Sequence, residues 1–439
     1  MDYILNIINS IIDCFSIRLS WEGLLGMYWF MFLVEVPRYF LMDIVVLSWR
    51  ALTARRREGR EKAARLLLYA ENPLVTVLAP GKNEGRNIFK LVRSLREQTY
   101  RNFEIIIVDD GSDDDTPFIC RDLEKDGYID KYLRLFPRGG KASAANYGVH
   151  HSKGKYIVHL DADSSLDRDA LERILLPFYM DRKVKGVGGT VKVRNADDSL
   201  CSSMQAIEYL NTIQVGRTVS DALGIYHIIS GAFGAFDKAA IRQVGCWDIG
   251  PGLDGDITQK LRKAGYKVRF ATHAVCMTNV PVKWHVLFKQ RLRWSKSLVR
   301  FRIRKHFNML LGWKNFSFLN FLSNMENILF DCVFNYLWFF YILELSLTHT
   351  QSLMDIFIIG WMMRCVMAYI SFTLCMILSE RPREELKLAL YLPLKTLYTG
   401  YFLRITRLIA HTQEFFFFSS YKDPWNPEKT SVYARIAGN

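Results

Sequence analysis

Cysteine is scarce in this sequence, and no two cysteines lie close together. The eight cysteines form no CxxC pair and no spacing typical of a zinc site. They are scattered, mostly among apolar residues, as reduced thiols are in proteins of reducing compartments. We therefore expect the soluble part of the chain to face such a compartment. The cysteines are Cys14, Cys120, Cys201, Cys246, Cys276, Cys332, Cys365 and Cys375.

The sequence also lacks internal repeats and low-complexity tracts, and its first residues do not have the pattern of a cleavable leader. Residues 1–20 are amphipathic, but they contain no basic n-region and no small-residue cleavage site. A removable signal peptide is therefore not expected, and residues 1–20 are interpreted as an amphipathic N-terminal segment.

Acidic residues are outnumbered by basic ones. The chain has 44 Asp and Glu against 58 Lys and Arg, which gives a formal net charge of +14. Such a balance suits nucleic acid, an anionic membrane face or an anionic substrate. Much of the basic charge adjoins apolar stretches, whereas a nucleic-acid binder would carry it on its soluble face. We therefore expect membrane lipids, and no nucleic acid, among the partners.

Long apolar runs are confined to the two ends of the chain. Residues 21–49 are long enough to cross a bilayer, although Glu35, Pro37 and Arg38 interrupt the run. Either the two charges pair with each other or the segment consists of two shorter pieces. The basic stretch 50–73 follows, and the positive-inside rule places it in the cytoplasm.

Further membrane spans are predicted near the C-terminus. Residues 316–346 and 353–378 are apolar and long enough to cross, while 387–410 holds several cations and crosses or lies in the interface. These patterns predict a multi-pass protein of the inner or plasma membrane, with the middle of the chain in the cytoplasm.

Short apolar strands alternate with helical patterns from about Leu74 onward. Nearly continuous apolar strands are typical of a mostly parallel sheet with helices on both faces, which predicts an α/β fold. Polar residues follow the strand ends, where such sheets bind their ligands. The predicted strands are 74–80, 103–108, 131–136, 156–160, 184–193, 227–236 and 266–271.

Two carboxylates follow the strand at 156–160. Alternate residues of an extended chain point the same way, so Asp161 and Asp163 share one side. Two neighbouring acids repel each other unless a positive group lies between them, and a hard divalent cation such as magnesium or manganese suits them. The alternative is a surface turn with two solvated acids.

Four motifs occur in one order along the chain: Asp109-Asp110-Gly111-Ser112, Asp161-Ala162-Asp163, the acid Asp254, and Gln290-Arg291-Leu292-Arg293-Trp294. With the flanking apolar segments, they resemble the processive family 2 membrane glycosyltransferases, which include the cellulose, chitin, hyaluronan and poly-N-acetylglucosamine synthases. The resemblance extends by motif from about Leu74 to Trp294.

The resemblance implies a GT-A fold that binds a nucleotide-diphosphate sugar together with Mg²⁺ or Mn²⁺. Asp163 is expected to contact the metal directly, with Asp161 beside it, so that the cation neutralises the departing diphosphate. For Lys141, a solvated side chain after the Gly139-Gly140 turn is the alternative. The nucleotide-sugar-binding residues implied in this way are Pro80, Glu84, Asp110, Lys141, Asp161 and Arg293.

The same resemblance makes Asp254 the general base that takes a proton from the acceptor hydroxyl. The family usually has Thr-Glu-Asp at this point, where this chain has Gly252-Leu253-Asp254. Nearby Asp256 is interpreted as a helix N-cap, and His273 as a structural histidine rather than a third metal ligand. The residues expected at the acceptor are Ser230, Gly231, Gln290 and Trp294.

The run from Gln290 to Trp294 has an alternative interpretation as a membrane-interface helix with an aromatic anchor. The predicted organisation is an amphipathic segment, a transmembrane segment, a basic linker, a GT-A catalytic domain, amphipathic interface helices, C-terminal transmembrane or interface helices, and a tail. The corresponding ranges are 1–20, 21–49, 50–73, 74–280, 281–312, 313–412 and 413–439.

The expected function is processive, inverting synthesis of a β-linked polysaccharide from a UDP-sugar of the UDP-glucose or UDP-N-acetylglucosamine class. The growing polymer is the acceptor and passes through the membrane helices. No cyclic-dinucleotide domain is evident, so any regulation or export factor would be a partner subunit. The alternatives are an enzyme that adds one sugar to a lipid or oligosaccharide, and a non-catalytic membrane scaffold.

Overall fold

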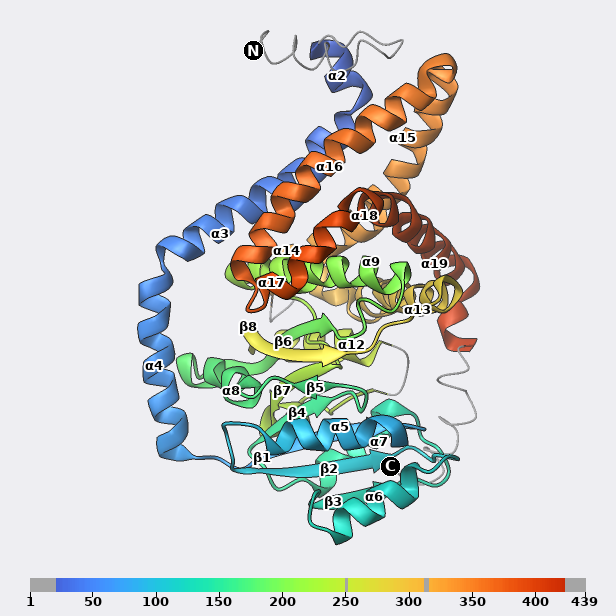
Figure 1. Ribbon diagram of the computed structural model, residues 1–439. Helices are drawn as coiled ribbons and strands as arrows, with labels where there is room; N and C mark the ends of the chain where they lie inside the picture. The colour runs from blue at the N-terminus through green and yellow to red at the C-terminus, as the bar shows by residue number, and fades with distance from the viewer. Residues whose placement is uncertain (1–20, 249–251, 312–315, 423–439) are drawn as a thin grey trace.

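A computed structural model describes residues 21–248, 252–311 and 316–422 of the chain. Figure 1 shows an α/β body with a layer of C-terminal helices on one side of it. The predicted amphipathic segment 1–20 and most of the predicted tail lie outside the described residues.

A single eight-stranded sheet forms the centre of the α/β body, in the order β3-β2-β1-β4-β7-β6-β8-β5. Strands β3, β2, β1 and β4 run parallel, as do β6 and β8, whereas β7 is antiparallel to both β4 and β6. The strands are β1 (Val75–Gly81), β2 (Phe103–Asp109), β3 (Lys131–Arg134), β4 (Tyr156–Leu160), β5 (Ser165–Leu166), β6 (Val184–Val193), β7 (Phe233–Asp237) and β8 (Lys267–Thr278).

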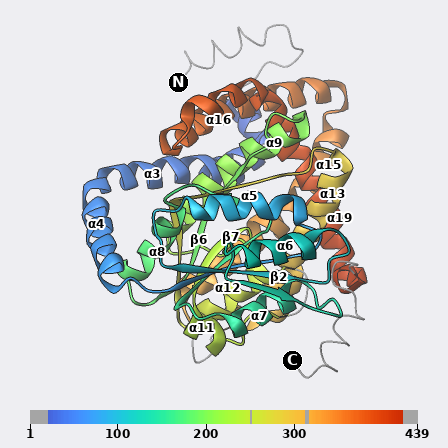
Figure 2. The same cartoon turned by 60° about the horizontal axis from the view of Figure 1, so that its bottom comes forward.

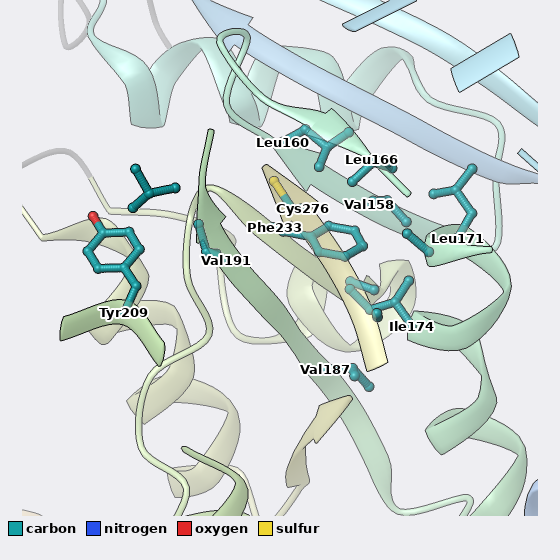
Figure 3. Close-up of a cluster of buried hydrophobic side chains, with 14 of the residues drawn as sticks. Val158, Leu160, Leu166, Leu171, Ile174, Val187, Val191, Tyr209, Phe233 and Cys276 are labelled. Atoms are coloured by element: carbon teal, nitrogen blue, oxygen red, sulfur yellow. The ribbon is translucent and has the colours of Figure 1, made fainter. Parts of the chain in front are cut away.

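Helices cover both faces of this sheet, as predicted. Val77 and Ala79 of β1 belong to one buried cluster, while Leu78 between them belongs to a second cluster on the opposite face. Figure 3 shows the first cluster, where Phe233 of β7 lies near Ile174. The helices around the sheet are α4 (Ala54–Glu71), α5 (Gly85–Arg96), α6 (Thr116–Lys125), α7 (Lys141–His151), α8 (Ala170–Met180), α9 (Leu200–Tyr209), α11 (Lys238–Gln243) and α12 (Leu253–Lys263).

Two predicted strands differ by several residues from their bounds in the structure. Strand β7 begins at Phe233 rather than at residue 227, because the Ile229 N–H donates to the hydroxyl of Thr258 and not to a neighbouring strand. Strand β8 extends beyond the predicted end at Ala271, because its pairing with β6 continues past a register shift at Gly189.

Helix α9 has no counterpart in the sequence prediction, and neither does the chain that follows it, a π-helical segment (Leu210–Gly216) and α10 (Arg217–Ala222). Nearly every residue of α9 is buried. A helix that is covered on all sides lacks the one-sided apolar pattern that reveals a surface helix. In Figures 1 and 2, α9 lies between β6 and α16 (Leu353–Leu378).

Within the described residues, two helical stretches are long and apolar enough to cross a membrane, Phe318–Thr348 and Thr350–Leu378. They coincide with two of the predicted spans. The other two predicted spans are not among these stretches. Both hold charged side chains, Glu35, Arg38 and Asp43 in the first and Lys395, Arg404 and Arg407 in the second, and both consist of several helical pieces. The pieces are α2 (Trp21–Met27), two π-helical turns (Met31–Glu35 and Pro37–Leu41) and α3 (Met42–Leu52) at one end, and a 3-10 segment (Leu386–Tyr391), α18 (Leu392–Leu397), a π-helical turn (Tyr398–Phe402) and α19 (Leu403–Phe417) at the other.

The charges inside residues 21–49 do not pair with each other, so that hypothesis was wrong. Glu35 forms ion pairs with Arg364 and Arg404, and the Arg38 guanidinium donates to Glu326 at 2.6 Å. Glu35 and Arg38 therefore each link the N-terminal helices to a C-terminal helix by an ion pair. No local pattern in the sequence predicts these pairs.

We predict that Gly148→Ala destabilises the fold. A Cβ at this position of α7 would lie 2.2 Å from Leu78 Cδ1 and 3.0 Å from Val108 Cγ2, both fully buried. Overpacking of this kind costs about 1–3 kcal/mol, so the midpoint of thermal unfolding should fall by several degrees.

The matched control is Gly59→Ala in α4, where a Cβ meets nothing within 4 Å. Both glycines are helical and gain the same helix propensity from alanine, so only the clash separates them. Equal midpoints for the two variants would contradict the packing of α7 on the sheet.

Candidate active site

Asp110 follows β2 and fixes the loop that leads into α7. Its carboxylate accepts hydrogen bonds from the backbone N–H groups of Gly139 at 2.8 Å and Gly140 at 2.9 Å, and from Arg138. Burial raises the pKa of Asp110, and these donors oppose the rise. Asp110 therefore positions Lys141, the first residue of α7, and its predicted contact with the nucleoside stays a prediction.

Lys141 lies among the acids of the site, with 36% of its side chain exposed. Its ammonium group forms an ion pair with Asp161, and it also acts electrostatically on Asp254 and Asp163. Burial alone would raise the pKa of Asp161, but Lys141 holds that pKa below its usual value, with a smaller contribution from Arg293. The fold thus brings Lys141, Arg293 and the predicted aspartates together.

Asp163 and Glu84 carry the excess negative charge of the site. Burial raises the pKa of Asp163 to about 6, and the charges of Asp161 and Glu84 add to the rise. Glu84 stands at the N-cap of α5, where burial raises its pKa as well. Pro80, in the preceding strand β1, is buried at the same edge of the sheet.

This donor set fits a divalent cation shared with a ligand. Among the described residues, no three His, Cys, Asp or Glu side chains come together as a metal site. A cation at this place would have two ligands from the chain, the carboxylates of Asp161 and Asp163. Mg²⁺ is commonly held by one or two carboxylates together with phosphate oxygens of a substrate. A cation bound between the acids would offset their mutual repulsion.

Asp254 is the second residue of α12 and is held against a glycine. The backbone N–H of Gly231 donates to its carboxylate, and a Cβ on Gly231 would lie 2.4 Å from Oδ1. Burial raises the pKa of Asp254, with Asp161 adding to the rise and Lys141 opposing it. The Gly231 carbonyl lies 2.8 Å from Nδ1 of His159, so β4 supports the loop that holds this acid.

Ser230 and Gly252 complete the surroundings of Asp254. The Ser230 hydroxyl lies next to Gly231 and accepts from the Ala232 N–H at 3.4 Å. Gly252 has φ +82°, and a Cβ there would approach Ser297 Cβ to 2.5 Å. A larger residue at position 252 would therefore be strained in this chain.

Two weaker candidates have structural roles. Asp256 is not the N-cap of α12, as was predicted, because Gly252 occupies that position. Its buried carboxylate lies 2.7 Å from His306 Nε2 and 2.7 Å from Lys305 Nζ, so it joins α12 to the end of the π-helical segment Leu298–Lys305. His273 contacts Glu380, as expected of a structural histidine.

Helix α13 (Trp284–Ser297) carries the Gln290–Trp294 motif and packs against α19. The Trp294 ring is 42% exposed, and Arg291 Cζ lies 4.5 Å from its centroid. Gln290 Oε1 is buried and accepts no hydrogen bond from the described residues. Trp294 therefore presents an open aromatic face, while Gln290 has an unused acceptor nearby.

Sequence analysis missed a buried polar group that fixes this helix. Arg291 Nη2 lies 2.9 Å from Glu208 Oε2, and the Tyr398 hydroxyl donates to the same oxygen at 2.6 Å. These residues come from α13, α9 and the C-terminal helices. In the sequence, the only sign of this buried group is that Glu208 is an acidic residue with several apolar neighbours.

Two adjoining cavities lead away from the acids. A cavity of about 220 Å³ is lined by Trp294 and by Gly255, the neighbour of Asp254. A second cavity of about 460 Å³ extends among the helices that carry Glu35 and Arg404. The two share Glu208, His227, Ile228, Asn327, Asp331, Leu403 and Arg407 as lining residues.

We predict that Glu208→Ala destabilises the chain far more than Tyr398→Phe does. The first change leaves the Arg291 charge buried and unpaired, which costs about 3–5 kcal/mol. The second removes one hydrogen bond and keeps the ion pair, at about 1 kcal/mol. Thermal unfolding of both variants measures the difference, and similar midpoints would mean that the ion pair does not anchor α13.

Comparison with known proteins agrees with this geometry. Residues 76–245 match the profile of the family described as Glycosyl transferase family 2. The chain is 33% identical over 215 residues to the poly-beta-1,6-N-acetyl-D-glucosamine synthase of Staphylococcus epidermidis, covering 49% of this chain and 52% of that protein. It is 32% identical over 238 residues to the enzyme of the same name from Staphylococcus aureus, covering 54% and 57%.

The match therefore spans about half the length of these curated relatives. Among solved structures, a mannosyltransferase from Pyrobaculum calidifontis in complex with GDP-Man and Mn²⁺ has a TM-score of 0.58 at 18% identity. That similarity covers 85% of this chain and 99% of the mannosyltransferase, and it bears on the fold alone. The fold is the GT-A glycosyltransferase fold, and over residues 76–245 the chain is similar to Glycosyl transferase family 2.

Proposed function

We propose that this chain is an inverting, processive hexosyltransferase that extends a β-linked polysaccharide from a UDP-sugar. The observation that carries the proposal is the convergence of Asp254, Asp161 and Asp163 on Lys141. A partly buried base beside a paired-acid site suits sugar transfer from a nucleotide diphosphate. Because the relatives are named as poly-N-acetylglucosamine synthases, UDP-N-acetylglucosamine is the first donor to test, followed by UDP-glucose.

Asp163 and Asp161 would hold Mg²⁺ or Mn²⁺, as the Mn²⁺ in the mannosyltransferase complex suggests. When bound, the cation neutralises charge on the diphosphate leaving group. Lys141 and Arg293 supply further positive charge at the same place, and their N–H groups suit phosphate oxygens. Pro80, Glu84 and Asp110 are proposed to surround the nucleoside.

Asp254 is the proposed general base. Its raised pKa makes the carboxylate a better proton acceptor than a solvated aspartate. Gly231 holds it by one backbone hydrogen bond, which leaves other lone pairs for the acceptor hydroxyl. Ser230, Gly231, Gln290 and Trp294 are proposed to contact the acceptor sugar, with the Trp294 ring as its platform.

The two adjoining cavities support passage of a polymer. Several buried polar atoms that line them have no hydrogen-bond partner among the described residues, including Asn211 Nδ2, Arg217 Nη1 and His227 Nδ1. Sugar hydroxyls both donate and accept hydrogen bonds, so a polysaccharide would satisfy such groups. The cavities lead from Trp294 towards the apolar helices, and we propose that the product crosses the membrane there.

This proposal places the protein in the inner or plasma membrane with residues 74–280 as a cytoplasmic catalytic domain. Residues 21–49 and 313–412 provide its membrane and interface helices, residues 281–312 carry the acceptor motif, and membrane lipids are its partners. A regulatory or export subunit is a further proposed partner.

The first test incubates the purified membrane protein with Mg²⁺ and a panel of UDP-sugars, and measures UDP release and product size. We expect long polymer from one sugar and a loss of more than about a hundredfold in rate for Asp254→Asn. Binding of UDP should be unchanged in that variant, because Asp254 is not placed at the nucleotide.

Other outcomes select among the alternatives. Addition of a single sugar would replace processive synthesis by transfer to a lipid or short acceptor. Absence of both UDP release and UDP binding would revive the non-catalytic scaffold. Full activity of Asp254→Asn would refute the assignment of the base.

Gly231→Ala tests the position of the base without removing it. The added methyl group overlaps the Asp254 carboxylate, with Cβ 2.4 Å from Oδ1 and 2.8 Å from Oδ2. A displacement of about 1 Å costs about a hundredfold in rate. The rate of UDP release should fall accordingly at saturating donor, while the affinity for UDP stays unchanged. Gly59→Ala is the control, and equal rates in the two variants would contradict this arrangement.

A further inference from the structure

A cavity of about 490 Å³ lies away from the proposed active site, between α4, α8 and the first half of β8. Val184, at the start of β6, lines it. The opposite ends of the same two strands approach the acids, where Thr278 donates to Asp163 Oδ1 at 3.3 Å and Arg194 donates to the Asp163 carbonyl at 3.2 Å. The cavity and the acids are therefore at opposite ends of β6 and β8.

Positive charge dominates the lining of this cavity. Seven arginines line it against three carboxylates. The most deeply buried of these acids, Asp221, is already bound by both nitrogens of the Arg269 fork at 2.8 and 3.1 Å and by the Phe270 N–H. Arg50 lies 3.9 Å from the same carboxylate. The Asp221 carboxylate thus offsets the charge of two guanidinium groups, those of Arg269 and Arg50.

Three of the arginines form no ion pair with any acid of the described chain: Arg57, Arg60 and Arg182. Arg57 Nε is buried and has no hydrogen-bond partner in the same part of the chain. Burial lowers the pKa of Arg50 to about 10, and repulsion by Arg57 adds to this effect. Burial lowers the pKa of Arg57 as well. Glu61 and Asp221 act electrostatically on Arg57, but seven arginines line the cavity against three carboxylates, so the cavity holds an excess of positive charge.

The backbone holds these groups in place at a bend. Helix α3 ends at Leu52 and α4 begins at Ala54, so Arg50 and Arg57 lie on either side of the bend. Arg57 Nη2 donates to the Arg50 carbonyl at 2.5 Å, which fixes its guanidinium group across the bend. Figure 1 shows α4 standing beside α8, with α3 leading towards the C-terminal helices.

We propose that this cavity binds a phosphate-bearing anion, namely the headgroup of an anionic phospholipid. Guanidinium groups bind phosphate oxygens through paired, charge-assisted hydrogen bonds. Leu176, Pro177 and Met180 add an apolar side to the lining, which suits a lipid better than a free ion. The lipid source rests on the proposed membrane placement, whereas the anion site itself rests only on the arginines.

The test compares two double variants of the full-length protein in detergent. Arg57→Gln with Arg60→Gln removes two unpaired charges from the cavity, and Arg55→Gln with Arg56→Gln removes two exposed charges from the same helix that do not line it. Native mass spectrometry with phosphatidylglycerol, and with phosphatidylcholine of the same acyl chains, measures lipid binding. Calorimetric titration with inorganic pyrophosphate tests the free anion, and UDP binding is measured in parallel.

We expect the wild type and the Arg55/Arg56 variant to bind phosphatidylglycerol in preference to phosphatidylcholine, and the Arg57/Arg60 variant to bind it about tenfold more weakly. Pyrophosphate binding that depends on Arg57 and Arg60, without a lipid preference, would support the anion site and identify a soluble source. Equal binding by both variants, to lipid and to pyrophosphate, would overturn the proposal. UDP binding should be unchanged throughout, so a failure of the proposed transferase activity would be recognised separately.

Discussion

The ion pair between Lys141 and Asp161 is the interaction on which the site depends. Asp161, Asp163, Asp254 and Glu84 lie near one another in surroundings that raise the pKa of most of them, and such a group is unstable without positive charge. Lys141 supplies that charge from the first turn of α7. Asp110 contributes indirectly, because its carboxylate accepts hydrogen bonds from Gly139 and Gly140 and so fixes the loop that precedes Lys141.

A second buried pair connects this site to the rest of the molecule. Glu208 and Arg291 join α9 to α13, and Tyr398 extends the connection to the C-terminal helices. Because Arg291 also stacks on Trp294, the platform proposed for the acceptor is fixed by a contact outside the catalytic sheet. Glu208, Arg291 and Trp294 also line the smaller of the two adjoining cavities, and Glu208 lines the larger one as well.

The sequence supported much of the fold and most of the candidate site. Alternating strands and helices and the Asp161-Ala162-Asp163 motif after β4 were predicted from local spacing, and Asp254 was implied by the family resemblance. The structure brings these acids near Lys141. The antiparallel course of β7 and the buried helix α9 were not predicted. Their conformation follows from backbone pairing and burial that involve distant segments, such as the Ile229 bond to Thr258.

The sequence by itself determined the class of fold, the order of the motifs and the positions of two long apolar helices, because periodicity and short spacing are local properties of the chain. Only the tertiary structure decided which charges meet. Glu35 pairs with Arg364 and Arg404 instead of nearby Arg38, and Glu208 pairs with Arg291. Arg57 donates to the Arg50 carbonyl instead of forming an ion pair. These partners are far apart in the sequence, so their pairing depends on how whole helices pack. A buried charge can pair only with a group that this packing brings next to it.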